Sequence, residues 1–185
     1  MTSYRNDNGL QQYATSLRDR QSGFTLTEVL VAVLVLSIGL VGVAGLQAVS
    51  LQNNQSAFMR SQASALAYDL ADRMRSNVPS ALGGLYDPTA AGMASGCSST
   101  SGCTPQDMAE NDLAEWNATI ATYLPMGQGF VCIDSTPDDG TGSGDAQCDG
   151  AGTLFAVKIW WDDDRDGTIN TTATNTERLA IVFQL

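Results

Sequence analysis

The residues of this chain that could carry chemistry are mostly carboxylates, since the sequence contains four cysteines and no histidine. Without histidine, the chain lacks the usual general base, the common imidazole metal ligand and any Ser–His or Cys–His nucleophile pair. Asp and Glu could still act as acids or bases, but no pair of them stands in an apolar setting. The sequence therefore gives little support to an enzyme, and we expect no cofactor.

The four cysteines, Cys97, Cys103, Cys132 and Cys148, all follow a long apolar segment. An even number of cysteines in an exported, loop-rich domain indicates two disulfides. A zinc site is the alternative, but it is disfavoured because the chain has neither a C-x-x-C spacing nor a histidine. Four cysteines allow three pairings. We favour Cys97–Cys103, which closes a small ring, with Cys132–Cys148, which ties the ends of an Asp/Gly-rich loop.

One acidic motif resembles the opening of a calcium-binding loop. Asp162, Asp164 and Asp166 alternate and are followed by Gly167, as in loops whose carboxylates wrap the ion around a turning glycine. Position twelve would be Ala173 instead of a bidentate Glu, and the flanking segments favour strands over helices. The pattern therefore favours a solvated hairpin turn, with an incomplete, weak calcium site as the alternative.

A single carboxylate, Glu28, stands near the start of an apolar run that has no ionisable side chain from residue 29 to residue 46. A charged side chain in such a position is disfavoured in lipid and needs a partner. If the chain were cut after Gly23, the new amine on Phe24 could supply that partner, in a neighbouring subunit. The alternative is that Glu28 simply lies at the level of the lipid headgroups.

The element that must hold these residues is a membrane helix. Residues 24–46 would extend about 35 Å at 1.5 Å per residue, enough to span a bilayer. No small-residue cleavage site follows the run, so cleavage before it would leave a permanent anchor. The basic leader, residues 1–23, should stay inside the cell. We therefore expect a single-pass inner-membrane protein with a periplasmic C-terminal domain.

Beyond the membrane, the helix should continue to residue 78 and stop at Pro79 and Gly83. It carries an apolar stripe of side chains at four-residue spacing, with alanines beside it: Phe58, Leu66, Leu70, Met74 and Val78, with Ala63, Ala67 and Ala71. This predicts one long helix over residues 24–78, whose outer part covers a sheet.

The remaining chain, residues 79–185, is expected to form a small α+β domain. Thr104, Pro105 and Asp107 indicate the start of a second helix, which ends before Pro125. Its apolar face comprises Ala109, Leu113, Trp116, Ile120 and Tyr123. Three segments alternate as strands do: residues 130–133, 153–161 and 178–185. In the second of them, Lys158 faces away from the apolar side.

The charge of this domain makes nucleic acid an unexpected partner. The whole chain has a formal net charge of -11. After residue 80 there are fifteen acids but only Lys158, Arg165 and Arg178. Binding to nucleic acid depends mainly on Lys and Arg that neutralise phosphates.

The N-terminal junction resembles the signal of type IV prepilins and type II secretion pseudopilins, through Gly23-Phe24-Thr25-Leu26-Thr27-Glu28-Val29-Leu30. This resemblance implies that prepilin peptidase cuts after Gly23 and methylates the new N-terminal Phe24. It also implies that Glu28 supports docking between subunits, and that the fold is the type IV pilin fold. A leader of 23 residues is long for this family, which leaves the start codon open.

Further motifs resemble the PilV family of minor pilins: residues 67–77, Asp107-Met108-Ala109, Asp112-Leu113 with Trp116, residues 124–129, Val131-Cys132 and Trp160-Trp161. The resemblance implies a low-abundance subunit that primes pilus assembly with other minor and major pilins, and that supports adhesion and twitching motility. Two alternatives stay open. One is a type II secretion minor pseudopilin, and the other is an uncleaved, membrane-anchored periplasmic binding module.

Overall fold

A computed structural model describes residues 23–86, 88, 97, 100, 102–172 and 175–185. Apart from Gly23, the predicted leader lies outside the described residues. The chain divides into two compact units, residues 1–46 and residues 47–185. Helix α1, Leu26–Ser76, contributes residues to both units.

The second unit contains the predicted three-stranded sheet. Strands β1 (Gln128–Ile133), β2 (Phe155–Trp160) and β5 (Arg178–Phe183) pair in the order β1-β2-β5, with both pairs antiparallel. Between β2 and β5 the chain forms a small hairpin, β3 (Thr171–Thr172) and β4 (Asn175–Thr176). The α+β fold expected from the sequence is confirmed, and it is consistent with a type IV pilin fold.

Helix α3, Pro105–Tyr123, begins as its sequence predicts. The Thr104 side chain accepts a hydrogen bond from the backbone of Asp107, and the Asp107 side chain accepts one from the backbone of Thr104. This capping box satisfies two backbone donors that the first turn would otherwise leave unpaired. The helix ends at Tyr123, before Pro125.

The predicted end of the long helix needs a correction. Helix α1 ends at Ser76, and Asn77 separates it from a short helix, α2 (Val78–Leu82). Pro79 therefore lies in the first turn of α2 instead of stopping α1, a position that suits proline because first-turn N–H groups have no helical acceptor. The Asn77 side chain donates to the carbonyl of Pro105 at 2.8 Å, which ties this break to the start of α3.

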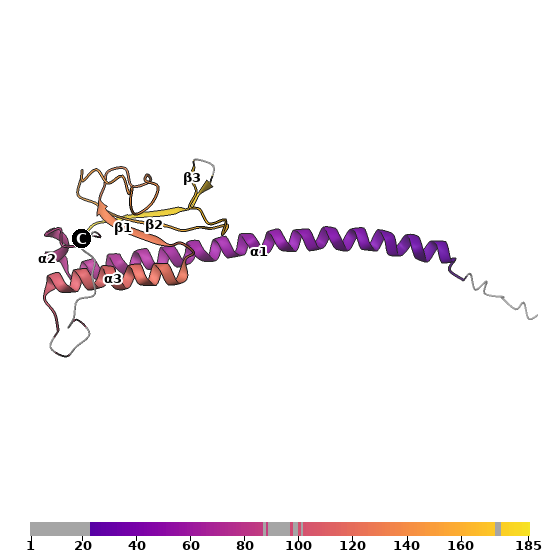
Figure 1. The fold of residues 1–185 in the computed structure, drawn as a ribbon, viewed down its shortest axis with the longest axis horizontal. Helices are drawn as coiled ribbons and strands as arrows, with labels where there is room; N and C mark the ends of the chain where they lie inside the picture. Colours follow the sequence, from indigo (N-terminus) through magenta and orange to yellow (C-terminus); the bar gives the residue numbers. More distant parts are fainter. Residues whose placement is uncertain (1–22, 87, 89–96, 98–99, 101, 173–174) are drawn as a thin grey trace, which may run out of the picture. The chain divides into compact units, whose positions relative to one another are not determined.

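One face of the sheet packs against α3 and the part of α1 that belongs to the second unit, and these two helices lie side by side (Figure 1). The core on this face joins residues of the helices and strands, including Leu70, Met74, Leu113, Trp116, Ile120, Val131, Val157 and Ile159. Two stripe predictions were wrong. Phe58 is 61% exposed, and its neighbour Met59 is buried in its place. Tyr123 is also exposed, because it lies in the last turn of α3.

The other face of the sheet is covered by the loop between β1 and β2, so every residue of β2 is buried. The loop reaches the sheet through polar contacts. Arg178 donates to the carbonyls of Asp138 and Gly140, and Ser143 donates to the side chain of Gln128. The Asp/Gly-rich segment is therefore a folded second layer and not merely a connection between strands.

Lys158 lies on this covered face and is fully buried. Its ammonium group donates to Asp139 Oδ1 at 2.5 Å and to the carbonyl of Ala146 at 2.7 Å, and it forms an ion pair with Asp134. The prediction that Lys158 faces away from the apolar side is correct, but that side is not open to solvent. The acidic loop supplies the counter-charges that allow this lysine to be buried.

Two glycines allow β1 to lie directly on α3. A Cβ added to Gly129 would lie 2.5 Å from the Trp116 ring, and one added to Gly127 would lie 2.8 Å from Ile120. The indole N–H of Trp116 donates to the carbonyl of Leu66 on α1 at 2.8 Å. From α3, Trp116 therefore packs tightly against both α1 and β1, as expected for a core anchor.

Candidate processing and assembly site

The junction between Gly23 and the start of α1 leaves Phe24 outside the helix. Gly23, Phe24 and Thr25 have no regular secondary structure, and α1 begins at Leu26. The Thr25 hydroxyl accepts a hydrogen bond from the backbone N–H of Glu28 at 3.2 Å, as an N-cap residue does. Thr25 therefore sets the start of the helix, and Phe24, at 82% exposure, stays accessible before it.

Glu28 lies in the first turn of α1. A carboxylate is favoured there because the N-terminal end of a helix carries a partial positive charge. This signal could have been read from the sequence, since Thr25-x-x-Glu28 has the spacing of a capping box. Glu28 thus has a local structural role available, in addition to the docking role that the resemblance implies.

Around Glu28 the surface of α1 is apolar. A shallow depression on the helix is lined by Phe24, Glu28 and four aliphatic or small side chains: Val29, Ala32, Val33 and Leu36. Glu28 is the one ionisable residue of this lining. A partner placed here would meet one carboxylate surrounded by hydrocarbon, where its charge would be screened far less than in water.

The apolar part of α1 is exposed throughout. An 18-residue window of the helix reaches a mean hydropathy of 2.8, and none of that window is buried. Among the described residues, α1 is the one helix long and apolar enough to cross a membrane. An exposed apolar surface of this extent needs lipid or protein to cover it. These properties fit a membrane-anchored protein.

Three glycines in this segment have no packing role within the chain. A Cβ added to Gly39, Gly42 or Gly45 would meet no atom within 4 Å. Glycine weakens a helix interior by about 1 kcal/mol relative to alanine. Since nothing inside the described chain compensates for this cost, any compensating close contact must come from outside the chain.

In the second unit, Arg73 of α1 connects the two helices. It contacts Asp69 on its own helix at 3.0 Å and two acids of α3, Asp112 at 3.0 Å and Glu115 at 3.1 Å. Although its partial desolvation acts in the opposite direction, these hydrogen bonds raise the pKa of Arg73 above its usual value. Asp69 and Arg73 are four residues apart, a spacing that allows them to pair on a helix, but their spacing does not indicate that Arg73 reaches α3.

Tyr86 completes this cluster. Its hydroxyl donates to the second oxygen of Asp112 at 2.8 Å. Burial and this hydrogen bond raise the pKa of Tyr86, so it stays protonated. The hydrogen bond from Arg73, with a second one from Asn111, holds the pKa of Glu115 below its usual range. Arg73 and Asp112, two of the residues that resemble the minor pilin motifs, therefore have a structural role in joining α1 to α3.

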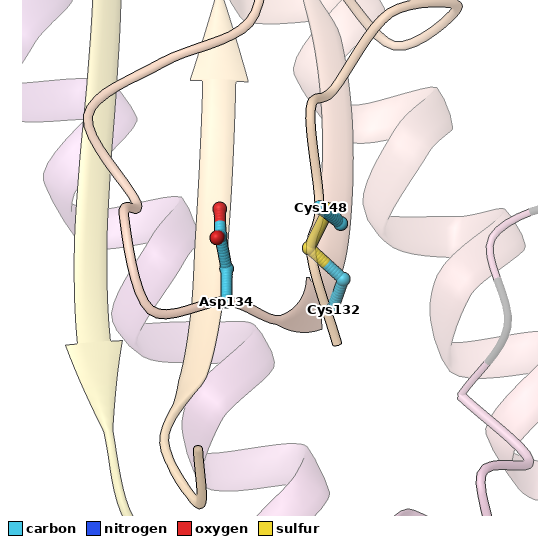
Figure 2. A group of neighbouring side chains, drawn as sticks. All are labelled: Cys132, Asp134 and Cys148. Atoms are coloured by element: carbon cyan, nitrogen blue, oxygen red, sulfur yellow. A yellow bond between two sulfur atoms is a disulfide. The ribbon is translucent and has the colours of Figure 1, made fainter. Parts of the chain in front are cut away.

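The structure forms the disulfides Cys97–Cys103 and Cys132–Cys148, the pairing that the sequence favours. Cys132, Cys148 and Asp134 lie close enough to suggest a metal site. However, the two sulfur atoms are bonded to each other (Figure 2). Asp134 forms an ion pair with Lys158. This group therefore offers no thiolate ligand and no free carboxylate.

The acidic motif after β2 is rearranged relative to the sequence prediction. Asp162 and Asp164 do come together, but the third acid beside them is Glu177 and not Asp166. The Asp166 carboxylate turns to its own loop and accepts from the backbone and hydroxyl of Thr168. The pairing of β2 with β5 could have indicated Glu177, because this residue directly precedes β5.

Comparison with known families covers the N-terminal half of the chain. Residues 18–44 match the family model described as the prokaryotic N-terminal methylation motif, and residues 45–114 match the one described as type IV pilin Tt1218. No curated protein and no solved structure matches the chain. The chain thus carries an N-methylation motif followed by a type IV pilin domain, which supports a pilin role with processing and assembly of the prepilin kind.

Proposed function

We propose that this chain is a minor type IV pilin of the PilV kind. Prepilin peptidase would cut it after Gly23 and methylate Phe24. Residues 24–46 would then anchor it in the inner membrane, with the C-terminal domain in the periplasm. From there it would join other minor and major pilins and prime pilus assembly, in support of adhesion and twitching motility.

The observation that carries this proposal is the coincidence of motif and geometry at the N-terminus. The match over residues 18–44 includes Gly23, Phe24 and Glu28. In the structure Phe24 is exposed and precedes the helix, so a peptidase could reach the bond before it. The helix that follows is apolar and uncovered, as an anchor and an assembly surface require.

Glu28 is proposed to dock the subunit through its charge. The apolar lining around it would exclude water and strengthen an ion pair with a cationic group. The amine freed on Phe24 of a neighbouring subunit is such a group, and it would be presented from an equally apolar helix. A docking pair of this kind would select for correctly processed subunits.

Replacing Glu28 by glutamine tests this role. Because Thr25 caps the backbone N–H of residue 28 and not its side chain, Glu28→Gln should keep the helix start and membrane insertion. Incorporation into sheared pili should fall severely, measured by immunoblot of pilus and membrane fractions. Thr27→Val, a change in the same turn that alters no charge, serves as the matched control and should incorporate normally.

Normal piliation and normal incorporation of the Glu28→Gln protein would contradict the docking role. A deletion strain separates the two assembly systems. Loss of twitching supports the pilus assignment, whereas loss of protein secretion with normal twitching would favour a pseudopilin. The family match to a type IV pilin supports the first outcome.

A further inference from the structure

The loop that leaves β2 brings three carboxylates together at the end of the sheet. The backbone N–H of Trp161 donates to the carbonyl of Glu177 at 3.2 Å, which continues the pairing of β2 with β5. The next residue, Asp162, donates from its backbone to the carbonyl of Pro125 at 2.9 Å. These contacts fix the backbones of Asp162 and Glu177 against the folded domain, whereas Asp164 projects from the exposed part of the loop.

The spacing of these carboxylates suits a bound cation. One oxygen from each of Asp162, Asp164 and Glu177 lies within 4.8 Å of the other two. Calcium binds oxygen ligands at about 2.4 Å, so two ligands on opposite sides of the ion are separated by about 4.8 Å or less. The three oxygens can therefore reach a single ion.

Two of these carboxylates each have a buried oxygen without a partner. Asp162 is 3% exposed and Glu177 is 1% exposed. One oxygen of Asp162 accepts from the backbone of Gly167, and one oxygen of Glu177 accepts from the backbone of Asn170. The other oxygens, Asp162 Oδ1 and Glu177 Oε1, are buried and accept no hydrogen bond.

Unpaired buried carboxylate oxygens are costly, and two buried carboxylates close together also repel each other. The two other buried acids among the described residues, Asp112 and Asp134, each have a cationic partner, Arg73 and Lys158. Asp134 Oδ2 accepts no hydrogen bond either, but it lies in the ion pair with Lys158. The salt bridges between described residues use Arg73, Arg75, Lys158 and Arg178, and none of them involves the three carboxylates. A cation between them would satisfy both orphaned oxygens at once.

The other acids of the loop are committed to local contacts. Asp163 accepts from the indole N–H of Trp161 at 2.8 Å, and Asp166 accepts from Thr168. Arg165 and Gly167 have positive φ angles of 61° and 87°, so the loop turns on both sides of Asp166. Asp162 and Asp164 also accept from the backbone of the loop, at Gly167 and Asp166 respectively, but unlike Asp163 and Asp166 they converge on Glu177 as well.

We propose that Asp162, Asp164 and Glu177 form a binding site for one calcium ion. The donors are all oxygens, the ligand type that calcium prefers, whereas zinc favours nitrogen and sulfur. Calcium also tolerates variable coordination geometry better than magnesium does, which suits the irregular loop. Glu177 takes the place of the glutamate that the sequence motif lacks at position twelve. Water and loop carbonyls would complete the coordination. This site does not depend on the pilin role.

Calorimetric titration of the full chain in detergent tests the proposal, with calcium chloride as the probe and magnesium chloride as the comparator. We expect one calcium per chain, with a Kd on the order of 10⁻⁴ to 10⁻³ M, as in extracellular calcium modules, and weaker binding of magnesium. Calcium should also raise the midpoint of thermal unfolding. Absence of both the binding heat and the thermal shift would overturn the proposal.

Two variants distinguish this site from the motif in the sequence. Glu177→Gln should weaken calcium binding by about tenfold or more, because it removes one of three ligand charges. Asp162→Asn should do the same while still accepting from Gly167. Asp166→Asn is the matched control and should bind nearly as tightly as the natural chain. Full binding by Glu177→Gln, or loss of binding in Asp166→Asn alone, would refute the assignment.

Discussion

At the scale of single residues, the structure shows which polar groups the fold depends on. Lys158 is the clearest case, since its charge is completely buried between Asp134 and Asp139 of the covering loop. Removing one partner of a buried ion pair leaves the others uncompensated, which costs more than the pair itself contributes. The lysine therefore determines how the acidic loop folds onto the sheet.

Replacing Lys158 by methionine should destabilise the protein by about 3–5 kcal/mol, because two acids would lose their buried counter-charge. Urea unfolding of the full chain in detergent, followed by tryptophan fluorescence, measures the change. The exposed Arg165→Met removes a positive charge from the same domain and should change stability by less than about 0.5 kcal/mol. Equal effects of the two substitutions would show that Lys158 has no special structural role.

Gly129 is a second residue whose type is required by its surroundings. In Gly129→Ala, the new methyl group would collide with the Trp116 ring, so we expect a loss of about 1–3 kcal/mol, typical of overpacking. Gly144→Ala provides the control, because a Cβ there meets no atom within 4 Å. A Gly129→Ala protein as stable as the control would mean that Trp116 shifts without cost.

At the scale of elements, much of the fold could be predicted from the sequence because its signals are local. Thr104, Pro105 and Asp107 mark the start of α3, and the alternation of apolar and polar residues marks the strands.

The errors arose where tertiary contacts override a local pattern. Phe58 follows the helical stripe but stays exposed, and Pro79 lies in the first turn of α2 instead of ending α1. The covering loop was missed because its contacts to the sheet join residues far apart in the chain.

The two candidate sites also differ in whether local sequence signals or tertiary contacts bring their residues together. Gly23, Phe24 and Glu28 lie within six residues of one another, so their motif can be recognised without a structure. By contrast, the acid that joins Asp162 and Asp164 comes from the far side of a hairpin. Only strand pairing brings Glu177 to them, so sequence spacing indicated Asp166 instead.

Three carboxyl groups that form ion pairs or accept hydrogen bonds predict how the stability of the fold depends on pH. The pKa of Glu115 is lowered by Arg73, and Ser135 lowers the pKa of Asp149 to about 2. Burial acts to raise the pKa of Asp139, but the hydrogen bond from Lys158 holds it below its usual range. Each carboxyl is therefore more acidic in the folded chain than in the unfolded chain.

The contribution of these carboxyl groups to the free energy of unfolding should be complete above about pH 4.5 and should fall as the pH is lowered toward about 2. The reason is that the same groups bind protons at a higher pH in the unfolded chain than in the folded chain. Urea midpoints of the full chain measured across this range provide the test. Glu115→Gln should flatten the upper part of the curve. A free energy of unfolding that stays constant or increases on acidification would be inconsistent with these pairs.

At the scale of the whole molecule, the chain combines an exposed apolar helix with a domain closed by two disulfides. The apolar part of the helix is left uncovered by the described chain, and its three glycines pack against nothing within it. Such a surface is suited to lipid first and to neighbouring helices afterwards. The central claim is that cleavage before this helix produces the assembling subunit.

The most direct test is the intact mass and the N-terminal sequence of the protein isolated from its native membranes. The account predicts a mature chain that begins with N-methylated Phe24 and retains both disulfides. A prepilin peptidase deletion should leave the same protein at its full precursor mass. A chain from wild-type cells that keeps its leader in the membrane fraction would contradict the claim and would favour an uncleaved, membrane-anchored binding module.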